Sequence, residues 1–77
     1  MSAPADYSPD WSALLNRLRA RSQTPLAAIG RRIGMEERTI NRLARGEIRE
    51  PRFSHAMQLL DLAADALGER DWHDIRR

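Results

Sequence analysis

The sequence predicts an all-α fold, a compact bundle of four to five helices that includes two short helices joined by a tight turn. Three observations support this prediction. Apolar residues recur at intervals of three and four along most of the chain, the spacing that lines one face of a helix. Glycines and prolines fall between these segments, where helices end and begin. No segment alternates apolar and polar residues as a half-buried strand does.

The first helix is expected to begin at Ser8-Pro9-Asp10. Serine is a favoured N-cap, proline suits the first helical position, and an acid suits the positive end of the helix dipole. The apolar residues that follow fall at i, i+3, i+4 and i+7 and predict a helix with one buried face; they are Trp11, Leu14, Leu15 and Leu18.

Two short helices are predicted within residues 26–45. Thr24-Pro25 repeats the cap-then-proline start for the first of them, which is expected to end at Gly34, where a tight turn favours glycine. Gly30 has no side chain, so a second helix can cross close against it. That second helix is expected from about Glu37 to Arg45, ending at Gly46. Ile29 and Ile33 lie four apart, and Ile40 and Leu43 lie three apart. This pattern is typical of a helix-turn-helix, which places a helix in the major groove of DNA.

The longest periodic segment is 53–67, which Gly68 is expected to end. One apolar stripe is predicted along it at Phe53, Met57, Leu60, Ala64 and Leu67, widened by Leu59, Leu62, Ala63 and Ala66. A last short piece is expected from Asp71 to Arg77, with Trp72 and Ile75 as its apolar residues.

Length and composition exclude several classes of protein. With 77 residues the chain is expected to form one domain, 9–77, preceded by a flexible arm at 1–8. It has no cysteine, so it has neither disulfides nor thiolate metal ligands. No apolar run approaches the roughly 20 residues that a membrane span needs. The N-terminus lacks a basic segment followed by an apolar one, which favours a cytoplasmic protein.

Charge is concentrated in the middle of the chain. The net charge is +2, but residues 17–52 hold ten Arg and four Glu, a local charge of +6 between two acidic ends. All thirteen basic residues are arginine, so every cation can make a forked contact to phosphate or guanine. A basic segment that overlaps a helix-turn-helix pattern indicates a DNA-binding surface.

Residues 11–67 resemble the lambda-repressor-like DNA-binding domains, the Cro/C1-type helix-turn-helix family of phage repressors and Cro proteins. The resemblance rests on the L-x-x-I-G-x-x-I-G-M core of the motif, on Ile40, Leu43 and Gly46, and on the P-R-F segment at Pro51-Arg52-Phe53. It implies a bundle of four or five helices that binds a palindromic operator as a homodimer. No cofactor and no metal are expected.

The resemblance also implies which residues contact DNA. Those expected to face base edges are Glu37, Arg38, Asn41 and Arg42. Those expected to meet phosphates or the minor groove are Gln23, Thr24, Glu36, Thr39, Arg45, Arg49 and Arg52. Arg38 or Arg42 can fork to O6 and N7 of guanine, and Asn41 can pair with adenine. A plain phosphate contact or solvation is the alternative for each arginine.

Two positions depart from the family pattern. Glu36 stands where the family usually has a serine or threonine cap, and Leu26 where it often has a polar residue that binds phosphate; Gln23 or Thr24 could replace the latter. The adjacent acids at Glu36 and Glu37 either stabilise the helix start or, for Glu37, accept a hydrogen bond from cytosine N4. Our hypothesis is that Glu37 and Arg38 together read a half-site that contains C and G.

A homodimer is expected because two half-sites about 10–10.5 bp apart double the contacts of one small domain. The predicted interface is the C-terminal part, 53–67 with the tail, through Phe53, Met57, Leu60, Ala64 and Trp72, with Ile75 beside them. The alternative is that this whole surface packs into the monomer's own core.

The sequence bears on two other classes of function. An antitoxin-like module that binds a protein partner from the same operon remains an alternative, although only about ten residues follow Leu67. An enzyme is not expected. His55 and His73 are the only histidines, and the chain contains no paired carboxylates in an apolar setting, no glycine-rich phosphate loop and no metal-ligand spacing.

Overall fold

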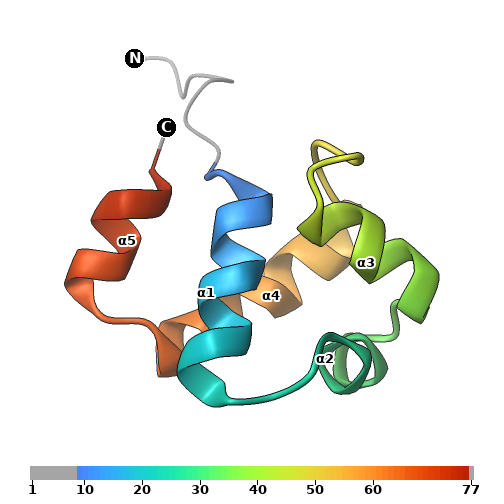
Figure 1. Ribbon diagram of the computed structural model, residues 1–77, viewed down its shortest axis with the longest axis horizontal. Coiled ribbons are helices and arrows are strands. Elements are labelled where there is room, and N and C mark those ends of the chain that lie inside the picture. The colour runs from blue at the N-terminus through green and yellow to red at the C-terminus, as the bar shows by residue number, and fades with distance from the viewer. Residues whose placement is uncertain (1–8, 77) are drawn as a thin grey trace.

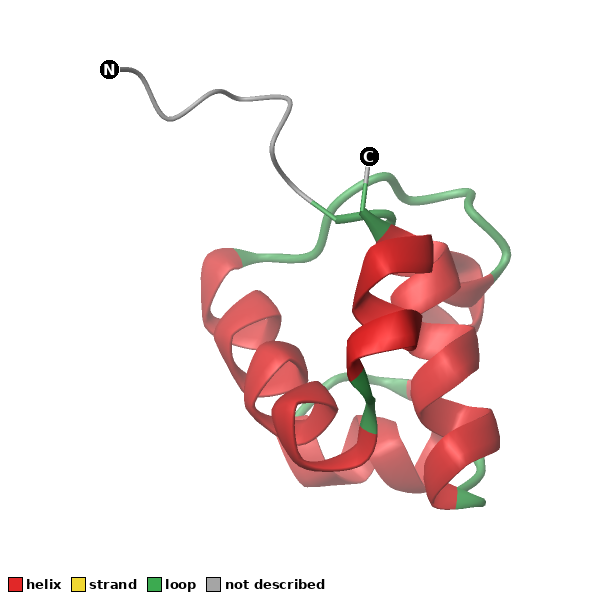
Figure 2. Cartoon of the chain, turned by 90° about the vertical axis from the view of Figure 1, so that its left-hand side faces the viewer, coloured by secondary structure: helices red, strands yellow, loops and turns green. Residues whose placement is uncertain are grey.

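The computed structural model describes residues 9–76 and contains five α-helices in that range (Figure 1). They are α1 (Trp11–Ser22), α2 (Leu26–Ile33), α3 (Glu37–Ala44), α4 (Phe53–Ala66) and α5 (Glu69–Ile75). The described chain has no strand, and loops alone connect its helices (Figure 2). The prediction of an all-α bundle of four to five helices is therefore confirmed.

Helix α1 is the centre of the bundle. It packs against α3, α4 and α5, while α2 packs against α3 and α4. The four residues of the predicted first stripe are all buried, Trp11 included. The rest of the core comes from every other helix and from Leu67 and Met35, with Leu59, Ile40, Leu43 and Ile75 among its fully buried side chains.

The helix starts differ from the predictions. Asp10 is the N-cap of α1, because its carboxylate accepts a hydrogen bond from the N–H of Ala13 at 3.2 Å. Pro9 precedes the helix, so the prediction that it is the first helical residue is wrong, and Ser8 lies outside the described residues. At α2 the cap position belongs to Pro25. The hydroxyl of Thr24 donates instead to the carbonyl of Ser22 at 3.1 Å, so Thr24 is not the cap.

The turn between α2 and α3 follows the prediction at both glycines. Gly34 has φ +80°, and the N–H of Met35 donates to the carbonyl of Gly30 at 2.8 Å, which closes the end of α2. A Cβ added to Gly30 would lie 2.7 Å from the carbonyl oxygen of Met35 and 3.4 Å from Ile40 Cγ2. The close approach predicted at Gly30 is confirmed.

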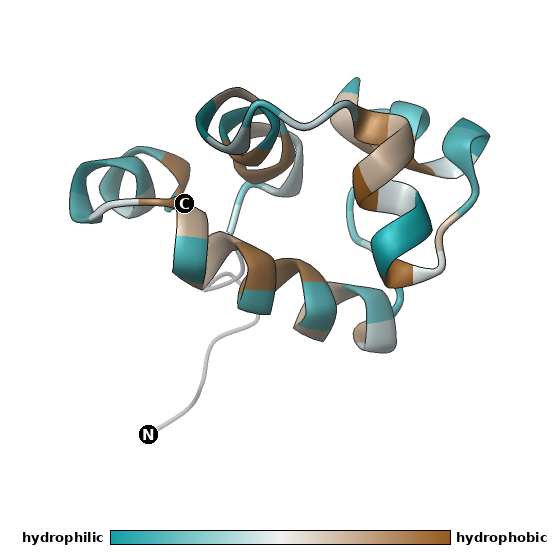
Figure 3. Ribbon diagram, turned by 90° about the horizontal axis from the view of Figure 1, so that it is seen from below, coloured by the Kyte–Doolittle hydropathy of each residue, from teal (hydrophilic) through white to brown (hydrophobic). Residues whose placement is uncertain are grey.

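The residues of the apolar stripe predicted along 53–67 do not all lie on the same side of the structure, because some are buried and others are exposed. Helix α4 ends at Ala66, and the residues it buries belong to the widening set, Leu59 and Ala63. Phe53 is 80% exposed and Met57 47% exposed, so they lie outside the core. Figure 3 shows apolar and polar positions mixed around this helix. Leu67 is buried, and its expected place on the same stripe as Phe53 is therefore wrong.

The last helix is held firmly to the first. Asp71 is buried, and its carboxylate accepts hydrogen bonds from Arg17 Nη1 at 2.6 Å, from Arg21 Nη2 at 3.0 Å and from the N–H of Gly68 at 3.1 Å. The hydrogen bonds from Arg21, Gly68 and Arg17 lower the pKa of Asp71 to about 2. The N–H of Asp10 also donates to the carbonyl of Ile75 at 2.8 Å. The short piece predicted at the C-terminus is thus an integral helix of the bundle.

Candidate nucleic-acid interface

Helix α3 has one polar face and one buried face. Ile40, Leu43 and Ala44 are buried against the rest of the bundle. Of the residues predicted to read bases, Glu37, Arg38 and Arg42 are exposed and Asn41 is half-buried. The exposed face of α3 therefore combines forked cations, an amide and an acid, the groups that can address base edges in a major groove.

The C-terminal end of α3 is fixed to α1 by two side chains that the sequence analysis missed. Ser12 Oγ donates to the carbonyl of Ala44 at 2.6 Å, and Asn16 Nδ2 donates to the same oxygen at 3.0 Å. Helix ends leave carbonyls without intrahelical partners, and these bonds satisfy one of them. The only sequence feature that could have indicated this is a pair of polar residues four apart beside the apolar stripe of α1.

The N-terminal end of α3 has no side-chain cap. Glu36 occupies the cap position in an extended conformation, and its carboxylate makes no capping hydrogen bond. Glu37 lies in the first turn, where a negative charge interacts favourably with the helix dipole. Both acids are exposed.

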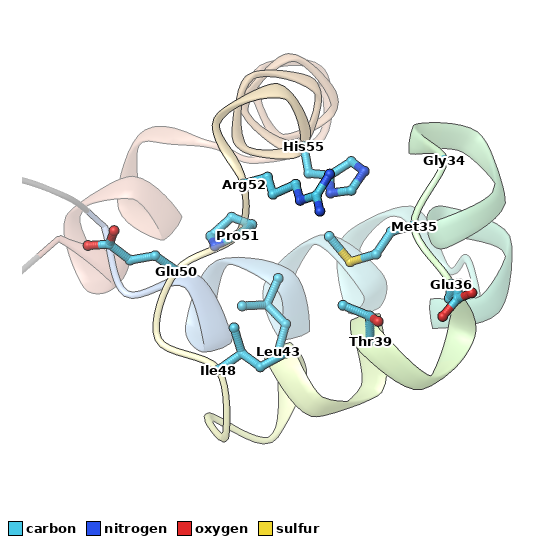
Figure 4. A pocket seen from close by; sticks show the side chains of 10 residues that line it. All are labelled: Gly34, Met35, Glu36, Thr39, Leu43, Ile48, Glu50, Pro51, Arg52 and His55. Atoms are coloured by element: carbon cyan, nitrogen blue, oxygen red, sulfur yellow. The ribbon is translucent and has the colours of Figure 1, made fainter.

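A cavity of about 430 Å³ lies between α3 and the start of α4 (Figure 4). It brings together three residues that were predicted separately as backbone or minor-groove contacts, Glu36, Thr39 and Arg52. His55 from α4 and Glu50 from the preceding loop also line it. The cavity is open at the surface next to the exposed face of α3 and carries charges of both signs.

The chain leaves α3 through a tight, hydrogen-bonded turn. Gly46 has φ +82°. Its N–H donates to the carbonyl of Leu43 at 3.1 Å, and the N–H of Glu47 donates to the carbonyl of Arg42 at 3.0 Å. These two bonds form a Schellman motif, which uses the left-handed glycine to satisfy the last carbonyls of the helix. The backbone of Glu47 is thereby fixed beside the last turn of α3.

The carboxylate of Glu47 pairs with two of the predicted DNA-contacting arginines. Arg45 Nε donates to Oε2 at 2.8 Å and Arg45 Nη2 to Oε1 at 3.4 Å, while Arg42 Nε donates to Oε1 at 3.3 Å. The hydrogen bonds that Arg45 donates to Glu47 lower the pKa of Glu47 and raise the pKa of Arg45. The role of Glu47 was not predicted from the sequence, because only the turn at Gly46 brings it back over α3.

The remaining predicted phosphate contacts lie at the surface. Arg49 and Arg52 are exposed in and after the loop that leads to α4, and Gln23 is exposed at the end of α1. Gln23 has φ +53°, a left-handed conformation that is uncommon outside glycine. Thr24 is half-buried, and its hydroxyl hydrogen bond is directed to its own chain.

The basic middle of the sequence serves two purposes in the structure. Arg17 and Arg21 belong to the ion pairs that hold α5, and Arg42 and Arg45 pair with Glu47. Four of the ten arginines in residues 17–52 are therefore committed to internal ion pairs. The local charge of +6 therefore overstates the number of arginines that are available to contact a polyanion.

The residues predicted for a dimer interface lie on two helices, with Trp72 on α5 and the others on α4. Phe53, Met57 and Ala64 are exposed, and Leu60 and Trp72 are half-buried. Leu60 and Trp72 also line a largely apolar cavity of about 360 Å³. Ile75, which the sequence placed beside them, is fully buried in the core, so it is not available to a partner.

No family model, curated protein or solved structure matches this chain. Within residues 9–76 no helix combines the length and apolar character that a membrane span requires. No cluster of three potential metal ligands occurs in the described part of the chain.

Proposed function

We propose that this protein is a sequence-specific DNA-binding transcriptional regulator that acts by occupying its operator. The observation that supports the proposal best is α3. Its inner face is buried in the core and its C-terminal carbonyl is bonded by two side chains of α1, while Arg38 and Arg42 extend from the outer face. A short helix held rigidly and exposed on one arginine-rich face suits insertion into the major groove.

In this proposal the type of contact that each residue makes with DNA depends on its position on the surface. Arg38 or Arg42 forks to guanine, and Asn41 pairs with adenine. Arg49 contributes backbone contacts, which add affinity without sequence preference. Arg52 enters a narrow minor groove, where its charge reads shape. The resemblance of the motif to lambda-repressor-like domains of phage and prophage regulators agrees with this division.

The same proposal includes a homodimer formed through the exposed stripe of α4, by which we mean Phe53, Met57, Leu60 and Ala64. Phe53 is 80% exposed and directly follows Arg52. Contact between two copies at Phe53 therefore brings the two Arg52 side chains near the symmetry axis. A twofold dimer reads a palindromic operator, as expected of a repressor in a phage operon or of a protein that regulates its own operon.

A second candidate function is an antitoxin-like module that binds a protein encoded in the same operon. The same exposed stripe favours it, because large exposed apolar side chains mark interaction sites. An adjacent toxin gene would support this function, and an adjacent phage operon would support the first.

The experiment that tests the proposed function is a binding-site selection from random duplex DNA at two salt concentrations. We expect a twofold-symmetric site whose affinity falls steeply as salt rises. Arg38→Gln should abolish preference at one or more positions of the site. The control Arg70→Gln, which changes an exposed arginine of α5, should leave the preference intact. Absence of binding at low salt would exclude the DNA-binding function and direct the search to protein partners.

The selection also tests the pairing of Glu37 with Arg38. If Glu37 accepts from cytosine N4, Glu37→Gln changes the preferred base at one position of each half-site. An unchanged site would assign Glu37 to helix stabilisation alone.

A further inference from the structure

The turn after α3 contains a carboxylate that accepts hydrogen bonds from two arginines. Glu47 receives two N–H groups of Arg45 and one of Arg42. The second acid of the same loop, Glu50, makes no ion pair within residues 9–76. The pairing at Glu47 is therefore a property of its position and not of every acid on this surface.

We infer that Glu47 is a specificity-determining residue that weakens binding to the backbone of any DNA more than it weakens binding to the preferred site. The inference rests on the proposed function and deepens it, because it assigns unequal roles to two neighbouring arginines. Arg45 is held back from phosphate by Glu47, whereas Arg42 is oriented for base contact by the same carboxylate.

The hydrogen-bond geometry at Arg45 supports the first role. Its Nε and Nη2 both point to the carboxylate, one to each oxygen. This forked arrangement is the one that arginine also uses to grip a phosphate. A phosphate must therefore displace Glu47 from that edge of the guanidinium, and it must do so against the repulsion of a nearby negative charge.

The geometry at Arg42 supports the second role. Only Nε of Arg42 is bonded to Glu47. Its two terminal nitrogens make no hydrogen bond to the described residues, and a fork to O6 and N7 of guanine can use that pair. The bond to Glu47 therefore persists while Arg42 contacts a base, and it limits the directions in which the guanidinium points.

The turn after α3 keeps Glu47 in place. The N–H of Glu47 is bonded to the carbonyl of Arg42, and Gly46 has the left-handed conformation that this bond requires. The side chain thus starts from a fixed backbone position, which reduces the entropy lost when the ion pairs form.

The test compares Glu47→Gln with Glu50→Gln, which removes the same charge from the same loop without breaking an ion pair. Binding of each purified full-length variant is measured by fluorescence anisotropy. The probes are a labelled duplex with the selected site and a scrambled duplex of equal length and base composition, in a series of salt concentrations.

We expect Glu47→Gln to bind the scrambled duplex about fivefold more tightly than Glu50→Gln does, the upper range for an exposed ion pair. Its affinity for the selected site should rise less, so the ratio of the two affinities falls. The plot of log affinity against log salt for scrambled DNA should steepen by about one unit, because one more arginine reaches a phosphate.

A double-mutant cycle with Arg45→Gln separates this role from a general charge effect. If Glu47 acts through Arg45, the gain from Glu47→Gln largely disappears when Arg45 is absent. Equal behaviour of Glu47→Gln and Glu50→Gln, with the wild type still selecting a symmetric site, would overturn the inference and leave the proposed function standing. Failure of the wild type to bind any duplex would overturn both.

Discussion

Gly30 decides how closely α2 and the turn to α3 approach each other. A methyl group at this position would lie 2.7 Å from the carbonyl oxygen of Met35, which is backbone and cannot move aside alone. We expect Gly30→Ala to lower the free energy of unfolding by about 1–3 kcal/mol, the range for overpacking. Urea denaturation followed by circular dichroism measures it.

The matched control is Gly68→Ala, because Gly68 has φ −94° and no atom within 4 Å of an added Cβ. It should change stability by less than about 0.5 kcal/mol. If the two variants unfold at the same urea concentration, the tight approach at Gly30 does not limit stability.

Sequence reasoning at the scale of single residues succeeded where local geometry is decisive. Gly30 and Gly34 could be predicted because a missing side chain and a left-handed turn leave few alternatives. Glu47 could not be predicted, since its partners depend on the path of the chain after Gly46. The bonds from Ser12 and Asn16 to Ala44 join residues about 30 positions apart, and no local pattern encodes such a distance.

Helix α5 depends on a buried carboxylate for its attachment to α1. The pKa of Asp71 is lowered from 3.8 to about 2 by Arg21, by the N–H of Gly68 and by Arg17. A pKa depressed by folding stabilises the native state above the ordinary pKa, and this contribution is lost as pH falls through the interval between the two values. We therefore expect the wild type to lose this contribution between about pH 5 and pH 2.

The variant Asp71→Asn tests this expectation. It should be less stable than the wild type at pH 6, and the difference should shrink toward pH 2, where Asp71 begins to accept a proton. Urea midpoints measured over this pH range give the comparison. Asp65→Asn, which changes an exposed acid of α4 without an ion pair in the described part of the chain, should follow the wild type. A difference between wild type and Asp71→Asn that does not vary with pH would contradict the assignment.

At the scale of helices, the buried face of α1 and the C-terminal ends of α2 and α3 could be predicted, whereas the helix starts and the buried face of α4 could not. The stripe of α1 and the glycines that close α2 and α3 follow from periodicity and turn chemistry. The predicted starts of α1 and α2 were wrong because several residues in a row could serve as caps. The predicted stripe of α4 was wrong because an unusually apolar helix does not reveal which of its faces meets the core.

For the whole molecule, the exposed stripe of α4 predicts self-association. Phe53 and Met57 are largely outside the core, so replacing both by alanine removes apolar surface without leaving a cavity. At tens of micromolar we expect the wild type to sediment as a dimer and the double variant as a monomer. Its unfolding free energy should change little, while its affinity for a full palindromic site should fall to that of a half-site.

Asp65→Ala is the control, because it changes an exposed residue of α4 that is not three or four positions from any residue of the stripe. It should leave both sedimentation and affinity unchanged. A wild type that sediments as a monomer at the same concentration would contradict self-association in free solution. A double variant that fails to fold would contradict the peripheral position of Phe53 and Met57.

The bond between the N–H of Asp10 and the carbonyl of Ile75 joins the first and last helices. Both ends of the described chain lie on the same side of the molecule in Figure 1. The two ends of the described chain therefore lie close together. They could be joined by a linker, and the chain could be opened at another loop, without a change in the packing of the helices. Another domain could be fused to either end on this same side of the molecule. Removal of the last residues of α5 would break the bond between Asp10 and Ile75 and release the start of α1.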